Sequence, residues 1–376
     1  MNEQKQLLIL GNGFDLNCGL KSSYKDFFDW KYKEKSPGFK LADFSSTLKE
    51  KIENVKETRK GEFYPYLKEK FENLNSWDFL FLIHTFLEEN EEKNLFRWCD
   101  IETIIGITLG HLGAHSAYTD MEYFPNIVEF FFVQNDINYE KLLEELNEIE
   151  DAFKKFLSEQ VNSVNYSNKT REKLNYLTAG SNVADILSFN YTLSEIKDEG
   201  VEKLRSFFNV HGNLESGKII FGIDSQDIAP RSGYYIFTKT YRSLISGFNN
   251  KRTKGLQKDI TKITFYGHSL SAGDYSYFES IFDFYDIYSS DVVIEFYCCL
   301  YEGGPFYLKE NNSIKKENYK AIINLISHYS GSLKESHGNN LLHKLLLENR
   351  LKIVYEKSRN YGKEHTDDKR ISEVSN

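Results

Sequence analysis

The feature that most constrains the fold is a short apolar run, residues 7–10, that stops abruptly at Gly11-Asn12-Gly13. A run of this length that ends in glycine is typical of a buried strand, because a helix needs a longer periodic segment. Glycine lets the backbone turn sharply and lets another group approach without a Cβ in the way. The sequence therefore predicts a buried strand near the start of the chain, followed by a tight loop.

Three later segments repeat this pattern, in which a strand-like run ends in glycine or a polar side chain. They end at residues 188–192, 210–212 and 266–270. Further β-type runs lie at residues 218–224, 291–299 and 351–356. Strands that alternate with helical pieces indicate a parallel α/β sheet, and such sheets bind ligands beyond the carboxyl ends of their strands. Four strand ends of this kind favour a ligand pocket over four unrelated turns.

The region between the first two strands reads as mostly helical. Residues 142–161 carry apolar side chains at helical spacing, which predicts a helix with one buried face. Because the first strand starts near residue 5 and the next near residue 184, the helical region is predicted to be an insertion in, or a lid on, an α/β domain. We predict an α/β core of residues 1–36 and 181–360, a helical insertion of residues 37–180 and a disordered tail of residues 365–376.

Composition narrows the functional class. The 376 residues carry a formal net charge of −9, and 40% are hydrophobic, which is enough for a substantial core. The acidic balance argues against a broad nucleic-acid-binding face, although a local basic groove stays possible. Four cysteines without a CxxC pair predict neither a zinc ribbon nor a disulfide framework. A polar start and no apolar run of about 18–20 residues predict a cytoplasmic protein without signal peptide or membrane span.

An ordered set of short motifs resembles one known family. The chain contains, in the order typical of the bacteriophage abortive infection AbiH family, the segments GNGFDLNCGLKSSY, WCDIE, SFNYT, VHG, FGID, FTKTY and FYGHSLSAGDYSYF. The resemblance covers most of the chain, and the ordered set is more specific than any single motif. It implies an anti-phage role in bacteria.

The same elements resemble, more distantly, the sirtuin-like (SIR2-like) NAD-binding fold. Its GAGxSxxSG loop cradles the dinucleotide pyrophosphate, and GNGFDLNCG has the same glycine spacing with Asp15 in the serine position. SFNYT, VHG and YGHSL are similar to its asparagine, histidine and late glycine–serine motifs. Asp15 adds a negative charge, Thr192 stands where relatives often have an acid, and the CxxC pairs of deacetylating sirtuins are missing. The resemblance therefore implies a Rossmann-like sheet and the NAD-hydrolysing branch.

This resemblance implies roles for individual residues in cleaving NAD(P) to nicotinamide and ADP-ribose. Asn190 is expected to hold water or a ribose hydroxyl, and His211 to act as a base, since an unperturbed imidazole has a pKa near ~6.5. Asp100 is a third catalytic candidate. Backbone N–H groups of the first loop would carry the pyrophosphate, and the late loop would meet the adenosine. The predicted dinucleotide-binding residues are Gly11, Asn12, Gly13, Asp15, Gly19, Gly267, Ser269 and Asp274.

Other roles, including purely structural ones, stay open for the predicted catalytic residues. His211 can also be a core histidine bonded to backbone, and Asn190 a turn-capping amide. Asp100 and Glu102 can bind a ribose or a metal, or pair with Arg97. A further histidine in the late loop, at position 268, is a secondary candidate, because alternate positions at a strand end diverge.

Three functions remain open on the sequence alone. The first is an NAD(P) glycohydrolase with NAD as substrate or ligand and no metal. The second is a metal-dependent nucleotide or nucleic-acid hydrolase that uses Asp15, Asp100 and Glu102 in the same pocket. The third is a non-catalytic sensor of NAD or ADP-ribose. We expect a homo-oligomer without membrane contact and with an unknown phage trigger, and nucleic acid stays open as a partner.

Overall fold

The computed structural model of the chain describes residues 4–36, 38–53, 63–90, 101–112, 138–163, 165–192, 201, 203–226, 228–247, 255–301, 307–333 and 340–358. The chain divides into two compact units. The first contains Met1–Ser22, Gln160–Ser216 and Lys251–Asn376, and the second contains Ser23–Glu159 and Gly217–Asn250. The predicted domains have other borders, because they followed the hydropathy pattern alone, and that division stays a prediction. The predicted tail, residues 365–376, lies outside the described residues.

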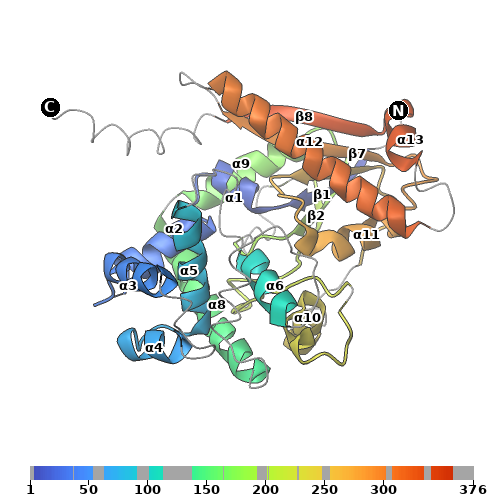
Figure 1. Cartoon of the computed structure of the whole chain (residues 1–376). Coiled ribbons are helices and arrows are strands. Elements are labelled where there is room, and N and C mark those ends of the chain that lie inside the picture. Colours follow the sequence, from blue (N-terminus) through green and yellow to red (C-terminus); the bar gives the residue numbers. More distant parts are fainter. Residues whose placement is uncertain are drawn as a thin grey trace. The chain divides into compact units, whose positions relative to one another are not determined.

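The first unit is built on a six-stranded sheet (Figure 1). Its strands are β1 (Lys5–Leu10), β2 (Val183–Ser188), β3 (Leu204–Asn209), β6 (Lys262–Tyr266), β7 (Val293–Tyr301) and β8 (Leu351–Ser358). Their order is β3-β2-β1-β6-β7-β8, and every neighbouring pair is parallel. Counted along the chain, this is the order 3-2-1-4-5-6 of doubly wound dinucleotide-binding sheets. The prediction of a parallel α/β sheet is confirmed.

The register of the sheet aligns four strand ends. Leu10 at the end of β1 pairs with Ser188 of β2 and Tyr266 of β6, and Ser188 pairs with Asn209 of β3. The loops that follow these strands therefore start side by side. The strand order reverses between β1 and β6, and in doubly wound sheets this switch point is where ligands bind.

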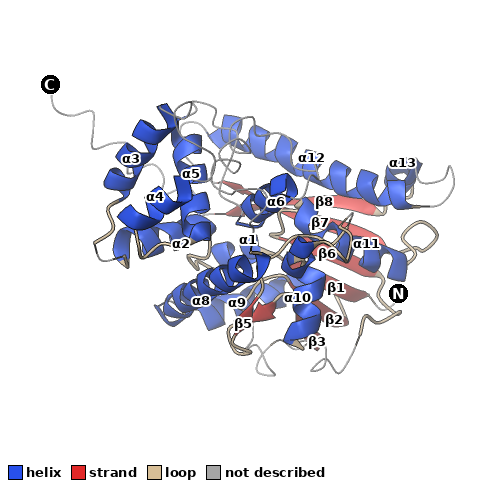
Figure 2. Ribbon diagram, turned by 60° about the horizontal axis from the view of Figure 1, so that its bottom comes forward, coloured by secondary structure: helices blue, strands red, loops and turns tan. Residues whose placement is uncertain are grey.

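Apolar side chains form a core cluster on each face of the sheet, and helices lie beside its strands (Figure 2). Because successive residues of a strand point to opposite faces, Leu7 and Ile9 belong to one core cluster, and Leu8 and Leu10 to the other. The helices of this unit are α1 (Asn12–Asn17), α9 (Tyr166–Thr178), η5 (Ala272–Asp274), α11 (Tyr275–Phe284), α12 (Tyr307–Ser332) and α13 (Leu341–Leu347), and it also holds the short strand β4 (Gly212–Asn213).

The second unit is mostly helical. The predicted apolar stripe of its long helix is confirmed, since the buried residues include Leu142, Leu146, Ile149, Phe153 and Phe156. The elements are α2 (Tyr24–Phe28), η1 (Asp29–Glu34), α3 (Leu41–Glu53), α4 (Phe63–Lys70), α5 (Ser76–Asn90), α6 (Ile101–Leu112), α8 (Tyr139–Ser163, whose last residues belong to the first unit), β5 (Lys218–Ile219), η3 (Gly233–Phe237) and α10 (Lys239–Ser246).

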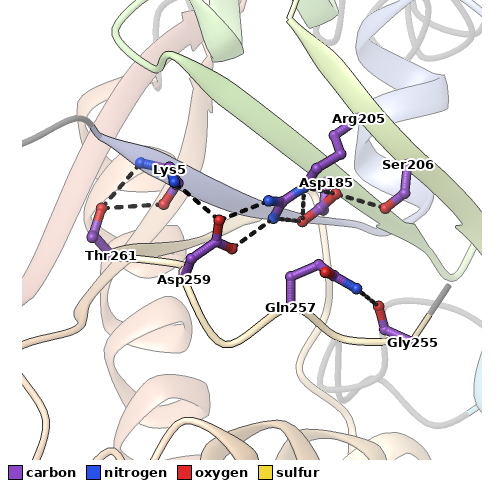
Figure 3. Close-up of polar contacts among 8 residues, drawn as sticks. All are labelled: Lys5, Asp185, Arg205, Ser206, Gly255, Gln257, Asp259 and Thr261. Carbon is purple, nitrogen blue, oxygen red and sulfur yellow. Dashed lines mark hydrogen bonds and ion pairs between the residues drawn. The ribbon is translucent and has the colours of Figure 1, made fainter.

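An ion-pair network ties the amino edge of the sheet together (Figure 3). Arg205 of β3 donates from Nε to Asp185 of β2 at 3.0 Å, and from Nη1 to Asp259 in the loop before β6 at 2.8 Å. Lys5 of β1 also pairs with Asp259, with 3.1 Å between Nζ and Oδ2. Ser206 donates its hydroxyl to Asp185 at 2.7 Å. Three strands and the loop into a fourth are thus joined by charge at the edge away from the predicted site.

Candidate active site at the carboxyl edge of the sheet

The structure gathers four predicted site residues at the carboxyl edge of the sheet. Gly11 follows β1, Asn190 lies just beyond β2, His211 just beyond β3, and Gly267 follows β6. Since the register aligns the ends of these strands, the loops that carry the four residues begin next to one another. All of them belong to the first unit.

Glycines allow the two loops at the switch point of the sheet, those after β1 and β6, to contact each other. The N–H of Gly11 donates to Tyr266 O at 3.0 Å, and the N–H of Gly13 donates to Gly267 O at 2.8 Å. A Cβ added to Gly13 would lie 2.7 Å from Gly267 Cα, and one added to Gly11 would lie 2.5 Å from His268 Cα. Glycine is required here because the loops touch. Two of the three N–H groups expected to carry a pyrophosphate, those of Gly11 and Gly13, thus donate to the protein's own carbonyls, and pyrophosphate binding by this loop stays a prediction.

Three further predicted residues lie nearer the surface. Asn12 and Ser269 are exposed, and Asn12 Oδ1 accepts a hydrogen bond from Ser22 Oγ at 2.6 Å. Gly19 has a φ of +81° and its N–H donates to Leu16 O, which is how glycine ends a helix. The local role of Gly19 is therefore to end α1, and dinucleotide binding by these three residues stays a prediction.

Asp15 points into the interior of the unit. Its side chain is buried, its Oδ1 accepts from Tyr166 OH at 2.6 Å, and its Oδ2 accepts from Thr192 Oγ1 at 2.6 Å. Within the described part of the chain, no lysine or arginine forms an ion pair with it. Burial raises the pKa of Asp15 to about 6, although hydrogen bonds from Thr192, Tyr166 and the Asn190 side chain lower it in part. The carboxylate thus faces hydroxyl and amide donors from three segments.

Asn190 joins the loops after the first three strands. Its Nδ2 donates to Gly11 O at 3.0 Å, and its backbone N–H donates to Ser188 Oγ at 3.1 Å. Its backbone carbonyl accepts from Asn209 Nδ2 at 2.8 Å. Asn209 is the last residue of β3, two positions before His211, so these hydrogen bonds run from the β1 loop to the histidine segment.

His211 and His268 share one carboxylate. His211 Nε2 lies 3.0 Å from Asp274 Oδ1, and His268 Nε2 lies 3.4 Å from Asp274 Oδ2. The backbone N–H of Leu270 donates to His268 Nδ1 at 3.0 Å, so a neutral His268 carries its proton on Nε2, toward the carboxylate. Asp274, predicted to bind the dinucleotide, here orients both histidines. A carboxylate that orients an imidazole and stabilises its protonated form is the arrangement of a general base.

Aromatic rings enclose this cluster. The ring centroid of Phe189 lies 5.3 Å from that of His211 and 4.8 Å from that of His268. Tyr277 contacts His211 with 5.2 Å between centroids. The side chains of His211 and Asp274 are only 3% and 8% exposed. An apolar wall of this kind keeps bulk water from a reacting group and strengthens its polar contacts.

Of the two other acids of the prediction, the structure describes only Glu102. Asp100 lies outside the described residues. Glu102 belongs to α6 in the second unit, where its Oε2 lies 2.7 Å from Nζ of the buried Lys239. In the same unit the buried Arg242 pairs with Glu150 and donates to Phe221 O at 2.6 Å. Lys239 of the segment FTKTY thus belongs to one buried ion pair, and Phe221 of the segment FGID accepts a hydrogen bond from the other. A structural role explains both segments.

Sequence reasoning missed Tyr166 as a member of the site. It is the first residue of α9, in the region predicted to be an insertion, yet its hydroxyl contacts both Asp15 and Thr192, the latter at 2.9 Å. No local pattern marks this tyrosine. His268, a secondary candidate, lies beside Asp274 and belongs to the cluster.

The described ranges lack the helices of a membrane protein and the side-chain clusters of a metal site. In those ranges no helix combines the length and the apolar character needed to cross a membrane. They also contain no group of three or more histidine, cysteine, aspartate or glutamate side chains with the geometry of a metal site.

Comparison with known proteins gives one match. The sequence profile of a family described as bacteriophage abortive infection AbiH matches residues 7–296, which span the sheet from β1 into β7 and include every residue of the candidate site. No curated protein and no solved structure gives a significant match.

Proposed function

Because this chain belongs to the bacteriophage abortive infection AbiH family, its role lies in abortive infection, and we propose that it acts there by hydrolysing NAD(P) to nicotinamide and ADP-ribose. The observation that carries the proposal is the pairing of His211 with Asp274 at the carboxyl edge. The sheet order 3-2-1-4-5-6 supports a dinucleotide as the ligand of this edge. The resemblance of SFNYT and VHG to sirtuin-like motifs, which lie at neighbouring strand ends, supports a SIR2-like sheet.

In the proposed reaction the bond between nicotinamide and ribose C1′ breaks, and nicotinamide leaves with the bonding electrons. A water oxygen bonds to C1′, and the proton of that water goes to His211. An ionised Asp274 can only accept, so His211 donates Nε2–H to it, and the basic nitrogen of the neutral ring is Nδ1. Asp274 then stabilises the imidazolium. A positioned base of this kind contributes about 10²–10⁴-fold to the rate.

The contacts of Asp15 weaken the hypothesis of a metal-dependent hydrolase. Asp15 kept that hypothesis open, but its two carboxylate oxygens accept hydrogen bonds from Tyr166 and Thr192 inside the protein. Glu102 is paired with Lys239. The hydroxyl and amine donors around these two acids favour structural or positioning roles over metal ligation.

The rest of the proposal concerns the setting of the reaction. We propose that the protein works in the cytoplasm as a homo-oligomer and is held inactive until an unidentified phage component triggers it. A resting state fits the burial of Asn190, His211 and Asp274, which as whole residues, backbone included, are 5%, 3% and 6% exposed. Substrate access then requires a change at this edge.

The test follows NAD(P), nicotinamide and ADP-ribose in cells infected with a phage that the wild-type chain restricts. We expect NAD(P) to fall and both products to rise in the wild type, and nicotinamide release to be about 10²–10⁴-fold slower in His211→Ala. His328→Ala is the matched control, since that histidine pairs with Glu279 on α11 and its side chain is 37% exposed. It should behave as the wild type.

Two results would contradict the proposal. One is restriction of the phage by the wild type with constant NAD(P). The other is an unchanged rate of nicotinamide release in a His211→Ala variant that unfolds at the wild-type temperature.

A further inference from the structure

The buried carboxylate of Asp15 is linked to the candidate active site by a hydrogen bond with the Asn190 side chain. Tyr166 and Thr192 donate to its two oxygens at 2.6 Å each, and the Asn190 side chain is its third hydrogen-bonding neighbour. Asn190 Nδ2 also donates to Gly11 O at 3.0 Å. We propose that Asp15 is a positioning residue, whose ionised carboxylate fixes the orientation of the Asn190 amide and leaves the amide oxygen to meet a hydroxyl group of the substrate. This inference rests on the proposed function.

The argument starts from what each group can donate. An ionised carboxylate and a backbone carbonyl only accept hydrogen bonds, so the Asn190 amide must turn its NH₂ group toward Asp15 and Gly11. Its oxygen is then the atom that remains for a ligand, and an oxygen recognises a donor. A ribose hydroxyl or a water molecule is a donor, whereas a phosphate oxygen is not. The network therefore selects a sugar or water on Asn190 and disfavours a phosphate.

Protonation of Asp15 weakens this selection. A carboxylic acid carries one O–H donor, and Asn190 can then meet it with its oxygen as well as with its NH₂ group. Only Gly11 O then still requires the NH₂ group, so the orientation of the amide is held less firmly. Because burial brings the pKa of Asp15 to about 6, the change falls just below neutral pH.

The groups around Asp15 leave its charge uncompensated. Tyr166 faces it from α9, and the thiol of Cys18 at the end of α1 lies close enough for its own pKa to be raised to about 12, by burial first and by Asp15 second. Lys173 and Lys169 of α9 lower the pKa of that thiol and Glu356 of β8 raises it, each with a smaller effect than Asp15. Thr192 adds a neutral hydroxyl.

The first experiment observes the amide directly and needs no turnover. Side-chain amide signals of the full chain labelled with ¹⁵N-asparagine are followed by NMR between about pH 5 and pH 7, on either side of the pKa of about 6. The Asn190 signal is assigned from its loss in Asn190→Ala. We expect it to titrate in the wild type and to stay constant in Asp15→Asn. A pH-independent signal in the wild type, or the same titration in Asp15→Asn, would overturn the inference.

The second experiment uses variants that move the titration in a known direction. Tyr166→Phe and Thr192→Val each remove a donor to the charged form, so each should shift the midpoint upward by about one pH unit. Tyr176→Phe is the matched control, because it removes an exposed hydroxyl from the same helix. A midpoint that stays in place, or moves downward, in both Tyr166→Phe and Thr192→Val would overturn the inference.

The acidic limb of nicotinamide release should move with the same midpoint in these variants. If the midpoint of the acidic limb stays constant while the midpoint of the amide titration shifts, a role of Asp15 in the reaction would be overturned. Titration of the Asn190 amide in a chain that never releases nicotinamide would support the positioning role, and only the glycohydrolase proposal would then fail.

Discussion

The two edges of the parallel sheet hold their acids in opposite ways. At the amino edge, Asp259 faces Arg205 and Lys5, and these cations keep the pKa of Asp259 well below its usual range. At the carboxyl edge, Asp15 faces only neutral donors, and burial raises its pKa to about 6. The ion pairs stabilise the charged form of Asp259, whereas burial makes the charged form of Asp15 less favourable. Ion pairs therefore stabilise the amino edge of the sheet, whereas the carboxyl edge, where the candidate site lies, holds an acid that titrates near neutral pH.

The largest expected effect comes from closing the space between the two switch-point loops. Gly267→Ala would bring a Cβ within 2.4 Å of Phe14 N at a residue whose φ is +66°. We expect the free energy of unfolding to fall by about 3–5 kcal/mol, from overpacking and from the left-handed backbone together. Urea unfolding measures the change. Gly255→Ala at the amino edge is the control, since nothing lies within 4 Å of its added Cβ. Equal losses in both would remove the distinction between the edges.

Asp15→Asn should stabilise the protein at neutral pH. A raised pKa means that the folded state binds the proton more tightly than the unfolded state, so wild-type stability falls as pH rises from about 4 to about 6 and then stays level. The shift bounds the gain at roughly 3 kcal/mol above pH 7, and we expect about 1–3 kcal/mol. Unfolding curves from about pH 4 to pH 8 test this, with Asp291→Asn as the exposed control. Parallel curves for wild type and Asp15→Asn would refute it.

Arg205→Ala should have the opposite sign. It leaves Asp185, whose side chain is 7% exposed, without its main partner, so the free energy of unfolding should fall by about 2–3 kcal/mol. The contribution of Asp259 is smaller, because its side chain is 41% exposed and screened by solvent. Since the pKa of Asp259 is depressed, its contribution is present above about pH 4 and lost as pH falls further. The variant should therefore lose less stability than the wild type on acidification, and equal acid sensitivity would contradict the network.

Lys5→Gln should have the smallest effect, about 0.5 kcal/mol or less. Lys5 and Asp259 have side chains that are 27% and 41% exposed, and exposed ion pairs contribute little. The residual effect should vanish in concentrated salt. A loss of more than about 2 kcal/mol would show that Lys5, and not Arg205, fastens the amino edge.

Much of the carboxyl edge could be predicted because strand ends are a local signal. An apolar run that stops at glycine, asparagine or histidine marks where a strand ends, and parallel strands align those ends. The prediction of strands held for β7 and β8, but the run at residues 218–224 forms only the short β5. Composition suggests a strand there, whereas β-propensity depends on the partner that a segment finds.

The wiring of the site could not be predicted, because it depends on contacts between distant residues. Asp15 and Tyr166 are 151 positions apart, and His211 and Asp274 are 63 apart. The sequence shows a glycine at position 13, but not that another loop fills the space where its side chain would lie. It also shows two acids near position 100, but not that Glu102 faces Lys239.

The place of β1 in the middle of the sheet has a consequence for synthesis. The backbone N–H of Lys5 donates to Thr261, 256 positions later in the chain. At about 5–20 residues per second, a ribosome needs roughly 10–50 s to make that partner. During this interval the first strand has no neighbour on one side, and the loop after it lacks the loop after β6, which it contacts in the folded protein. A nascent chain therefore has no assembled carboxyl edge until Asp274 has emerged, so the proposed activity has no site before synthesis is well advanced.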